Sequence, residues 1–370
     1  MAKLEDVCSI NMGQSPESSS YNKTGEGIPF FQGNADFGKL HPTVRVWCNA
    51  PTKIAEQGDI LISVRAPIGA LNIANVQCCI GRGLAALTVN EILCCQKYLW
   101  YALECKVDEL NSKGTGSTFK AINKKTLAET EIPLPPLAEQ RRIAAVLDKV
   151  SDLIAKRRQQ LDKLDELVKA RFVEMFGDPS VNSRWSTEKL SQLGELNRGV
   201  SKHRPRNDPE LLGGPYPLIQ TGDVSNSGLY ILGYSSTYSE LGIAQSRLWK
   251  AGTLCITIAA NIAQTSILTF DACFPDSVVG FLPYNKTNAV FIHYWFSFFQ
   301  RILEEQAPQV AQKNINLKIL SDLDVIVPPY NLQKAFSDFV GQTEKSKLTI
   351  QQNLDKLEVL KKALMQQYFG

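Results

Sequence analysis

The chain has 370 residues, of which 44% are hydrophobic and 21% charged, and its 40 Lys and Arg against 37 Asp and Glu leave a formal net charge of +3. This is the composition of an ordinary globular chain long enough for two or three domains, which excludes a disordered tail, a collagen-like fibre and a membrane-spanning bundle. A charge this close to zero argues weakly against nucleic acid, because a small DNA-binding domain usually carries a larger excess of Lys and Arg.

The N-terminal segment lacks the apolar core flanked by positive charge that marks a signal peptide, and no window holds the ~20 apolar residues that span a bilayer. Nine cysteines without a Cys-x-x-Cys motif, in a chain with no export signal, indicate reduced thiols that pack as small hydrophobes in a cytoplasmic protein. His41, His203 and His293 lie far apart without ligand spacing, so we expect no metal site.

Two segments of similar pattern predict globular parts of mixed α/β structure. The runs "GDILISV" at 58–64 and "GTLCITIA" at 252–259 are apolar or alternating, each with a glycine in front, and are typical of strands. The aromatic-rich stretches "QKYLWYALEC" at 96–105 and "VFIHYWFSFFQRILEE" at 290–305 predict amphipathic helices that face a core.

Apolar residues spaced alternately by four and three follow two Pro-Pro pairs, at 135–136 and 328–329. This heptad spacing predicts two helices of roughly 38 residues, about 57 Å long, and Gly177 and Pro179 end the first of them. The seam positions are Ile143, Leu147, Val150, Ile154, Arg157, Leu161, Leu164, Val168, Arg171 and Met175, then Phe336, Val340, Thr343, Lys347, Ile350, Leu354, Leu357, Lys361, Leu364 and Tyr368.

The length of these helices and the polar breaks at Arg157, Lys347 and Lys361 favour a thin two-helix seam over a thick core. We therefore predict an intramolecular antiparallel coiled coil, with ordinary core helices as the alternative. Because the helices occupy equivalent places in two repeats, an antiparallel pair would put the two globular parts at opposite ends, related by a pseudo-two-fold axis.

The chain is an internal repeat. Five short segments recur at an offset of 193 residues. They are Ile122-Asn123 and Ile315-Asn316, the two Pro-Pro pairs, Gln140 and Gln333, "QLDKL" and "NLDKL", and Phe176-Gly177 and Phe369-Gly370. In the globular parts the offset between the copies varies. Lys3-Leu4 and Gly13 match Lys189-Leu190 and Gly199 at an offset of 186, whereas 58–69 matches 252–263 at an offset of 194. Each half therefore combines a variable globular part with a closely repeated helical part.

Catalytic motifs are missing from this pattern. "VPPY" at 327–330 superficially resembles the Asn/Asp-Pro-Pro-Tyr motif of amino-methyltransferases, but Val327 cannot accept a hydrogen bond, and a strand end leading into a helix explains both Pro-Pro copies. "GTGSTFK" at 114–120 lacks phosphate-loop spacing and is interpreted as a flexible polar segment able to bind a phosphate. A duplicated scaffold with no catalytic constellation favours binding over chemistry.

The layout of variable domain, helix, variable domain, helix resembles the specificity subunit of type I restriction-modification systems. The resemblance rests on "AINKKTLAETEIPLPPLAEQRRIAAVLDKVSDLI" at 121–154 and its echo "NINLKILSDLDVIVPPYNLQKAFSDFV" at 314–340, and it covers essentially the whole chain. "PLPPLAEQRRIA" is highly characteristic of that family, whereas "PPYNLQK" at 328–334 departs from its usual PPLxEQ pattern.

The resemblance implies two target-recognition domains, at 1–136 and 178–329, with spacer helices at 137–177 and 330–370. Each domain would read half of a split duplex DNA target, and the helices would set the half-site spacing and dock two adenine-N6 methyltransferase subunits. Restriction subunits are a possible further partner. The chain itself would be non-catalytic and without a cofactor, since S-adenosylmethionine would belong to the modification partner and ATP with Mg to the restriction partner.

Candidate DNA contacts follow from the side chains that read bases and phosphates, taken at loop positions. In the first domain they are Gln14, Lys23, Gln32, Asn34, Arg65, Arg82, Lys113, Thr115, Ser117 and Lys120. In the second they are Arg198, Lys202, Arg204, Arg206, Gln220, Thr221, Asn261, Gln264, Gln312, Lys313 and Asn314. For any one of them, a solvated loop side chain is the competing interpretation.

A different function class stays open: a duplicated coiled-coil adaptor that assembles protein partners without reading DNA. The charge of +3 does not exclude DNA, because 113–125 and 198–206 are locally basic while acidic residues elsewhere offset them. We expect the chain alone to bind DNA weakly, and tight binding to require the assembled complex.

Overall fold

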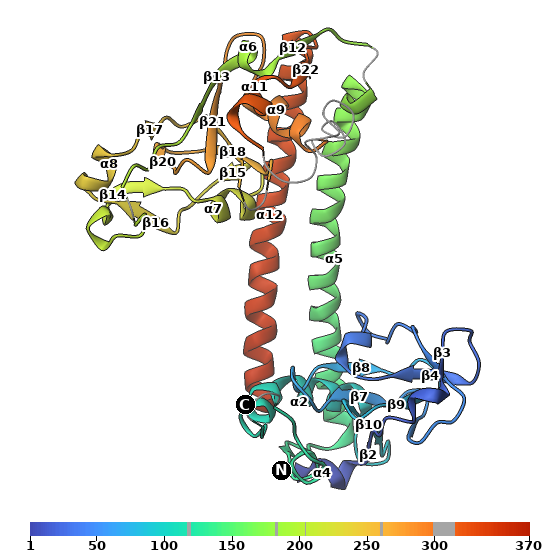
Figure 1. Ribbon diagram of the computed structural model, residues 1–370. Helices are drawn as coiled ribbons and strands as arrows, with labels where there is room; N and C mark the ends of the chain where they lie inside the picture. The colour runs from blue at the N-terminus through green and yellow to red at the C-terminus, as the bar shows by residue number, and fades with distance from the viewer. Residues whose placement is uncertain (117–119, 182–183, 204, 260–261, 299–314) are drawn as a thin grey trace. The chain divides into compact units, whose positions relative to one another are not determined.

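The computed structural model describes residues 1–370 except 117–119, 182–183, 204, 260–261 and 299–314 (Figure 1). The chain forms two compact units, one comprising 1–159 and 351–370 and the other 160–350. Both boundaries fall inside the long helices, so each helix contributes one part to each unit. The fold is mixed α/β, as predicted.

The first unit contains three sheets. A two-stranded sheet pairs β1 (Ala2–Lys3) with β11 (Glu131–Ile132). A four-stranded antiparallel sheet has the order β2 (Cys8–Met12), β10 (Leu84–Val89), β7 (Ile60–Ser63), β8 (Leu71–Ile73). A five-stranded sheet has the order β3 (Tyr21–Asn22), β5 (Trp47–Cys48), β4 (Ile28–Phe31), β9 (Cys78–Ile80), β6 (Ile54–Ala55), with β4 and β9 parallel.

The second unit repeats this topology, with one strand added to one sheet and one strand missing from another. The pair β12 (Thr187–Lys189) and β22 (Asp324–Ile326) matches β1 and β11. The sheet with the order β13 (Gly194–Arg198), β21 (Val278–Pro283), β18 (Leu254–Thr257), β19 (Thr265–Leu268), β15 (Tyr230–Ile231) matches the antiparallel sheet and adds β15, which pairs parallel with β19. The order β16 (Ser236–Tyr238), β14 (Leu212–Leu218), β20 (Ala272–Cys273), β17 (Leu248–Trp249) matches the other sheet without β3.

Short helices connect these strands. In the first unit they are α1 (Leu4–Val7), η1 (Ser18–Ser20), η2 (Asn34–Asp36), α2 (Gln96–Cys105), α3 (Val107–Ser112) and α4 (Lys124–Ala128). In the second unit they are η3 (Pro179–Val181), α6 (Leu190–Leu193), η4 (Pro209–Leu211), α7 (Thr221–Asn226), α8 (Glu240–Ala244), α9 (Ala289–Phe296) and α11 (Leu317–Ser321). The aromatic-rich segments contain α2 and α9, whose aromatic residues face the cores as predicted; α9 ends at Phe296, and positions 299–305 of the second predicted stretch lie outside the described residues.

Alternation along one strand creates two cores in each unit. In β7, Ile60 and Ile62 pack with α2 and the long helices, whereas Leu61 between them packs against the neighbouring sheet with Phe31 and Ile80. The equivalent strand β18 divides in the same way, with Leu254 and Ile256 on the helix side and Cys255 on the sheet side. Each unit is therefore sheet on sheet, with helices covering the outer face of one sheet.

The repeated sequence landmarks have local structural causes. Gly58 and Gly252 precede the buried strands at φ +97° and +89°, a left-handed conformation that costs a residue with a Cβ roughly 1–2 kcal/mol. Asn123 and Asn316 cap the helices α4 and α11, since their side chains accept hydrogen bonds from Thr126 N and Ile319 N. Each cap stabilises its helix by about 1 kcal/mol.

The two long helices are α5 (Leu137–Phe176) and α12 (Tyr330–Phe369), drawn green and red in Figure 1, and each has 40 residues. Every predicted seam position of both helices is buried or half-buried, so the seam is the inward face. Gly177, at φ +80°, ends α5 by donating its N–H to Val173 O at 2.8 Å. Strands β11 and β22 precede the Pro-Pro pairs, which confirms the strand-to-helix interpretation of "LPPL" and "VPPY".

Gln140 and Gln333 join each long helix to its globular part. Both are fully buried. Gln140 Nε2 donates to Pro135 O at 2.8 Å and Leu93 O at 3.0 Å, and its Oε1 accepts from Cys95 N at 2.8 Å. Gln333 makes the equivalent bonds to Pro328 O at 2.8 Å and Lys286 O at 3.0 Å, with Thr287 Oγ1 as the third partner at 2.9 Å. The repeated "PPLAEQ" and "PPYNLQ" segments thus form the same joint between helix and globular part in both units.

The polar residues in the seam have different partners. In the second unit Lys347 of α12 bonds Asp165 of α5 and Glu344, each at 2.8 Å; although burial opposes its charge, these carboxylates raise the pKa of Lys347. In the first unit Lys361 bonds Glu104 of α2 at 2.9 Å, so it ties α12 to the globular part and not to α5. Arg158, an exposed residue beside the seam position Arg157, bonds Glu358 across the two helices at 2.6 Å.

All nine cysteines are free, and all but Cys95 and Cys105 are buried, which confirms that they pack as small apolar side chains. Burial raises the pKa of the Cys8, Cys78 and Cys94 thiols to about 12. Among the described residues, no helix combines the length and the apolarity that a membrane crossing requires.

Candidate nucleic-acid interface

In the first unit, the ends of β2 and β4 meet the turn between β9 and β10, and the polar residues at this meeting point are called the first polar corner (Gln14, Ser15, Gln32 and Arg82). Gly13 ends β2 by donating to Leu84 O at 2.9 Å. A Cβ on Gly13 would lie 2.2 Å from Gly81 O, so only glycine lets the chain pass this close to the turn.

Ser15 organises the first polar corner. Its hydroxyl accepts from Gln32 Nε2 at 3.0 Å and faces the Arg82 backbone N at 3.4 Å. Gln14 is held by its backbone, donating to Ile80 O at 3.0 Å and accepting from Thr52 Oγ1 at 2.7 Å, so its exposed side chain projects outward. Gln14, Gln32 and Arg82 are therefore brought together as one exposed group of two amides and a guanidinium.

The second unit has the same backbone arrangement, here called the second polar corner (Ser201, Arg206, Gln220, Thr221 and Asp276). Gly199 donates to Val278 O at 2.8 Å, and a Cβ on it would lie 2.2 Å from Phe274 O, just as at Gly13. The backbone N of Gln220 donates to Asp223 Oδ2 at 2.8 Å, as that of Gln32 donates to Asp36 Oδ2 at 2.8 Å. This correspondence confirms that Gln32 and Gln220 occupy equivalent places.

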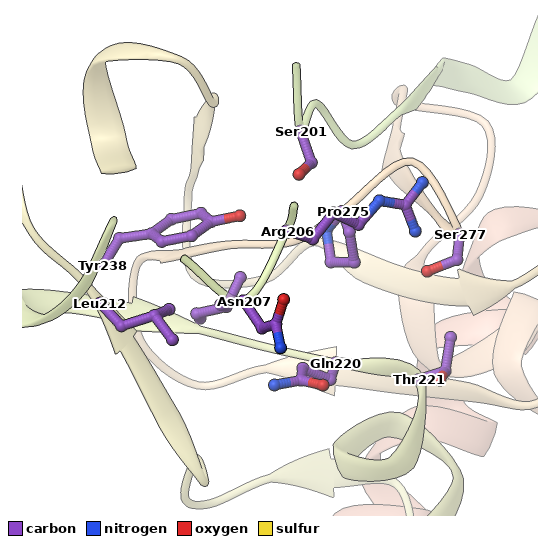
Figure 2. Close-up of a pocket in the computed structure, with 10 residues that line it drawn as sticks. Ser201, Arg206, Asn207, Leu212, Gln220, Thr221, Tyr238, Pro275 and Ser277 are labelled. Atoms are coloured by element: carbon purple, nitrogen blue, oxygen red, sulfur yellow. The ribbon is translucent and has the colours of Figure 1, made fainter. Parts of the chain in front are cut away.

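A pocket of about 280 Å³ opens at the second polar corner (Figure 2). Its lining residues are Ser201, Arg206, Asn207, Leu212, Leu218, Gln220, Thr221, Tyr238, Pro275 and Ser277. In Figure 2 the Ser201 hydroxyl and the Tyr238 phenol oxygen face the same space as the amides of Asn207 and Gln220. Three of the predicted contact residues, Arg206, Gln220 and Thr221, thus line one pocket whose polar groups suit hydrogen bonding to a base or sugar.

The stretch 198–206 is less basic in the folded chain than its sequence indicates. The guanidinium of Arg206 donates to the Asp276 carboxylate, and Arg198 Nε donates to the Asp276 backbone carbonyl at 2.8 Å. His203 lies 3.1 Å from Asp208, whose pKa is lowered first by the backbone N–H of Glu210 and then by His203. Folding therefore brings Asp276, a distant residue in the sequence, beside Arg198 and Arg206, whereas Asp208 is a local partner of His203.

Gln245 shapes the loop that carries these residues, because its Oε1 accepts from the backbone N–H groups of Lys202 and His203 at 2.5 and 3.0 Å. The Lys202 side chain is exposed.

A second group in the first unit surrounds Ala121. Arg65 and Thr115 both form isolated bridges with Ala121, and Ala66 N donates to Lys120 O at 3.1 Å. Arg65, Thr115 and Lys120 are therefore neighbours on one exposed surface. Lys113 lies nearby in sequence, but its ammonium bonds Glu109 at 2.6 Å, and this bond is the main cause of the lowered pKa of Glu109.

The family model described as the type I restriction modification DNA specificity domain matches residues 1–166 and 182–360, almost the whole chain and both repeats. The chain belongs to this family. Each matched segment covers one globular part, called a specificity domain below, and most of the long helix that follows it.

Relatives and solved structures agree with this assignment. A specificity subunit of the type I restriction enzyme MjaX of Methanocaldococcus jannaschii is 46% identical over 45% of this chain and 39% of its own length. The EcoBI specificity subunit of Escherichia coli is 22% identical over 88% of this chain and 75% of its own. The type I S subunit of M. genitalium has the same fold, with a TM-score of 0.57 at 15% identity, over 100% of this chain and 95% of the other.

A further solved chain, from a structure of complex assembly and conformational transition in a type I system, has a TM-score of 0.61 at 16% identity and covers 99% of this chain and 96% of its own. The match covers less than half of the length of two relatives from M. jannaschii, 39% of the MjaX subunit and 48% of the MjaIX subunit.

The remaining predicted contacts are spread over the two specificity domains. Lys23 is exposed on the turn that the Asn22 side chain closes by accepting from Thr24 N and Glu26 N. Asn34 is half-buried in η2. Gln264 is exposed, and its backbone bonds Thr257. The predicted contacts that lie outside the described residues are Ser117, Arg204, Asn261, Gln312, Lys313 and Asn314.

Sequence reasoning missed the residues that organise the two polar corners of the specificity domains. Ser15 and Ser201 follow the repeated glycines, Gly13 and Gly199, at an equal distance, so the repeat itself carried a signal for them. Asp276 had no such signal, because it stands opposite Arg82 in the repeat and its partners, Arg198 and Arg206, are about seventy residues away.

Proposed function

We propose that this chain is the DNA sequence-recognition subunit of a type I restriction-modification complex, in which each specificity domain reads one half of a bipartite duplex target. The observation that carries the proposal is the pair of polar corners. The same backbone arrangement, with Gly13 and Gly199 packed against a turn, presents different side chains in the two domains. Two domains with the same backbone arrangement and different polar side chains are suited to reading two different short DNA sequences.

Repeated surface residues on the long helices support docking of two identical protein partners. Lys163, Leu167 and Ala170 recur as Lys356, Leu360 and Ala363, and all six are exposed. Their spacing of four and three puts each set on one outward helix face. Leu167 and Leu360 are 49% and 45% exposed, although neighbouring positions such as Glu166 and Val359 have diverged.

Solvent-exposed leucines retained in both repeats are explained by a shared partner that buries them, because packing within the chain does not require them. We propose that these two faces each dock one adenine-N6 methyltransferase subunit. S-adenosylmethionine would then belong to those subunits, and ATP with Mg to any restriction subunit that joins them.

The proposal is tested by selecting from a random duplex library with the chain and its methyltransferase partner, followed by methylation mapping. Enrichment of a two-part sequence is expected. Enrichment of no sequence, with the complex intact, would support the alternative of an adaptor that joins proteins without reading DNA.

Docking is tested separately with Leu167→Glu and Leu360→Glu, each of which puts a charge into the proposed contact. Each single variant should retain one methyltransferase subunit and the double variant none, as measured by the mass of the complex. Leu153→Glu, an exposed leucine whose equivalent is Ser346, is the matched control and should retain both. Two bound subunits in the double variant would reject this docking face.

The near-neutral charge of the chain leads to a further expectation. With acidic partners beside 198–206, the free chain should bind DNA weakly and with a shallow salt dependence, whereas the assembled complex should bind tightly. Equal affinities of the free chain and the complex would contradict this.

We also propose that the long helices set the spacing of the half-sites. Inserting one heptad into both helices should change the preferred gap by an integer number of base pairs, as read by methylation-site sequencing. An unchanged gap would reject this role.

A further inference from the structure

The turn after β9 in the first domain and the turn after β20 in the second carry opposite charges at the same repeat position. Arg82 stands in the first turn, and Asp276 stands in the second at an offset of 194. Both turns complete a polar corner, next to Gln32 in one domain and Gln220 in the other. The second corner therefore carries a carboxylate at the place where the first carries a guanidinium, and a nearby cation must offset this negative charge if DNA binds there.

Among the described residues of the 198–206 stretch, Arg198 and Arg206 both bond Asp276, but to different groups of it. The Arg206 guanidinium donates to the Asp276 carboxylate. Arg198 Nε donates to the backbone carbonyl of Asp276 at 2.8 Å. The two arginines thus share one residue, while only Arg206 has its charge opposed directly by that carboxylate.

Because of this difference, the two arginines suit different DNA groups. A phosphate beside Arg206 would also lie beside the Asp276 carboxylate, and the repulsion between the two anions would offset the attraction of the guanidinium. A base edge carries no net charge, so it meets no such repulsion. A guanidinium has five N–H donors in a fixed fork, and bonding to Asp276 leaves others for a second acceptor pair.

The surroundings of Arg206 are also those of a base-reading group. Of the ten residues that line the pocket, Arg206 alone is charged, and the others include the neutral donors and acceptors Asn207, Gln220 and Thr221. Figure 2 shows its guanidinium beside Ser277 at the rim of this group. The N7 and O6 acceptors of guanine are the commonest specific partner of an arginine fork in the major groove.

We propose that Arg206, held in position by Asp276, reads a guanine in the half-site of the second specificity domain, and that Arg198 contacts a phosphate. Asp276 is then a positioning residue. The inference rests on the proposed function and adds which base is read, by which side chain, and why the repeat carries an acidic residue at this turn.

The experiment compares Arg206→Ala, Arg198→Ala and Asp276→Asn in the complex with the methyltransferase partner. Binding is measured on the selected target and on duplexes with single base-pair changes through both half-sites, over a range of salt concentrations. For Arg206→Ala, the preference for guanine at one position of the second half-site should fall on the order of tenfold, with the salt slope unchanged. Arg198→Ala should weaken binding to all duplexes alike and reduce the salt slope by about one.

Asp276→Asn should relax the preference at the same position as Arg206→Ala, and the double variant should lose no more than Arg206→Ala alone. The half-site of the first domain is the internal control for folding, since its base preferences should stay unchanged in all variants. Lys250→Ala breaks a pair of the same kind with Asp271, at 2.7 Å in the same domain, and should change neither preference.

Arg206→Ala that weakens all duplexes alike and lowers the salt slope would overturn the inference and make Arg206 a phosphate contact. Asp276→Asn with undiminished guanine preference would overturn the positioning role. In both cases the wild-type complex would still enrich a two-part target. If the proposed function itself were wrong, the wild-type complex would enrich no target.

Discussion

The two specificity domains are alike where each globular part joins its long helix and unlike at the polar corner. At the joint, Gln140 and Gln333 are fully buried and make the same two bonds, to a Pro-Pro carbonyl and to the loop before α2 or α9. At the corner the backbone is the same, but Arg82 in one domain stands opposite Asp276 in the other.

The free-energy cost of a substitution differs between the joint and the corner. Replacing a buried glutamine leaves backbone groups without hydrogen-bond partners, at about 1–3 kcal/mol each, so the joint has little freedom to vary. The corner side chains are largely exposed, and water satisfies whichever polar group is present there. A duplicated chain can therefore change what it reads without changing how it folds.

The largest effect is expected at the joint. Gln140→Leu and Gln333→Leu should each destabilise their own unit by about 3 kcal/mol, because each leaves buried backbone carbonyls unsatisfied. Hydrogen exchange followed by mass spectrometry would locate the loss in the unit that contains the substitution. A loss in only one of the two variants would show that the joints are not equivalent.

A smaller effect separates the second domain from the first. Burial lowers the pKa of His293 to about 4; a bond with Thr265 opposes this shift, and Lys347 and Lys169 add to it. The unfolded chain protonates His293 near pH 6.5, so the second unit should lose up to about 2 kcal/mol as the pH falls from 6.5 towards 4.

His293→Asn keeps an acceptor for Thr265 Oγ1 but does not titrate, and it should flatten this pH dependence in urea unfolding. The first unit, where Trp100 occupies the equivalent position, is the reference. Identical pH profiles for the variant and the wild type would contradict the assignment.

The turn after β18 offers a test of backbone strain. Ala263 has φ +59°, where the first domain has Gly69 at φ +90°, and both donate to the strand residue six positions earlier. Ala263→Gly should stabilise the second unit by about 1 kcal/mol, since glycine adopts this conformation without strain. Gly69→Ala should destabilise the first, where a Cβ would also lie 3.2 Å from Val107 Cγ2. The two changes in stability are measured as shifts of the denaturant midpoint of unfolding, with the slope of the free energy of unfolding against denaturant concentration unchanged.

The smallest effect is expected at the first polar corner. Arg82 has no carboxylate partner among the described residues and is exposed, which suits a phosphate contact. Arg82→Ala should reduce affinity severalfold on every duplex and lower the salt slope by about one. A change in base preference within the first half-site would instead make Arg82 a reading residue and the two corners more alike than proposed.

Local patterns determined much of the fold before any contact was known. The apolar or alternating runs at 58–64 and 252–259, the heptads of α5 and α12, and the stop at Gly177 each depend on a few adjacent residues, and the strands, the helices and the helix end appear as expected. The repeat also placed Gln32 and Gln220 at equivalent sites. The pairing of Lys361 was not predictable, because Glu104 is 257 residues away and belongs to a helix of the globular part.

The sequence by itself determined the duplication, the mixed α/β class and the two long helices, because periodicity and capping are local properties of the chain. Only the tertiary structure decided which arginine lies beside which carboxylate. Arg206 and Asp276 are seventy residues apart, and the loop that carries Arg206 is bonded at Lys202 and His203 by Gln245, from a third part of the chain. The charge that DNA would meet at this corner is therefore a property of the folded chain.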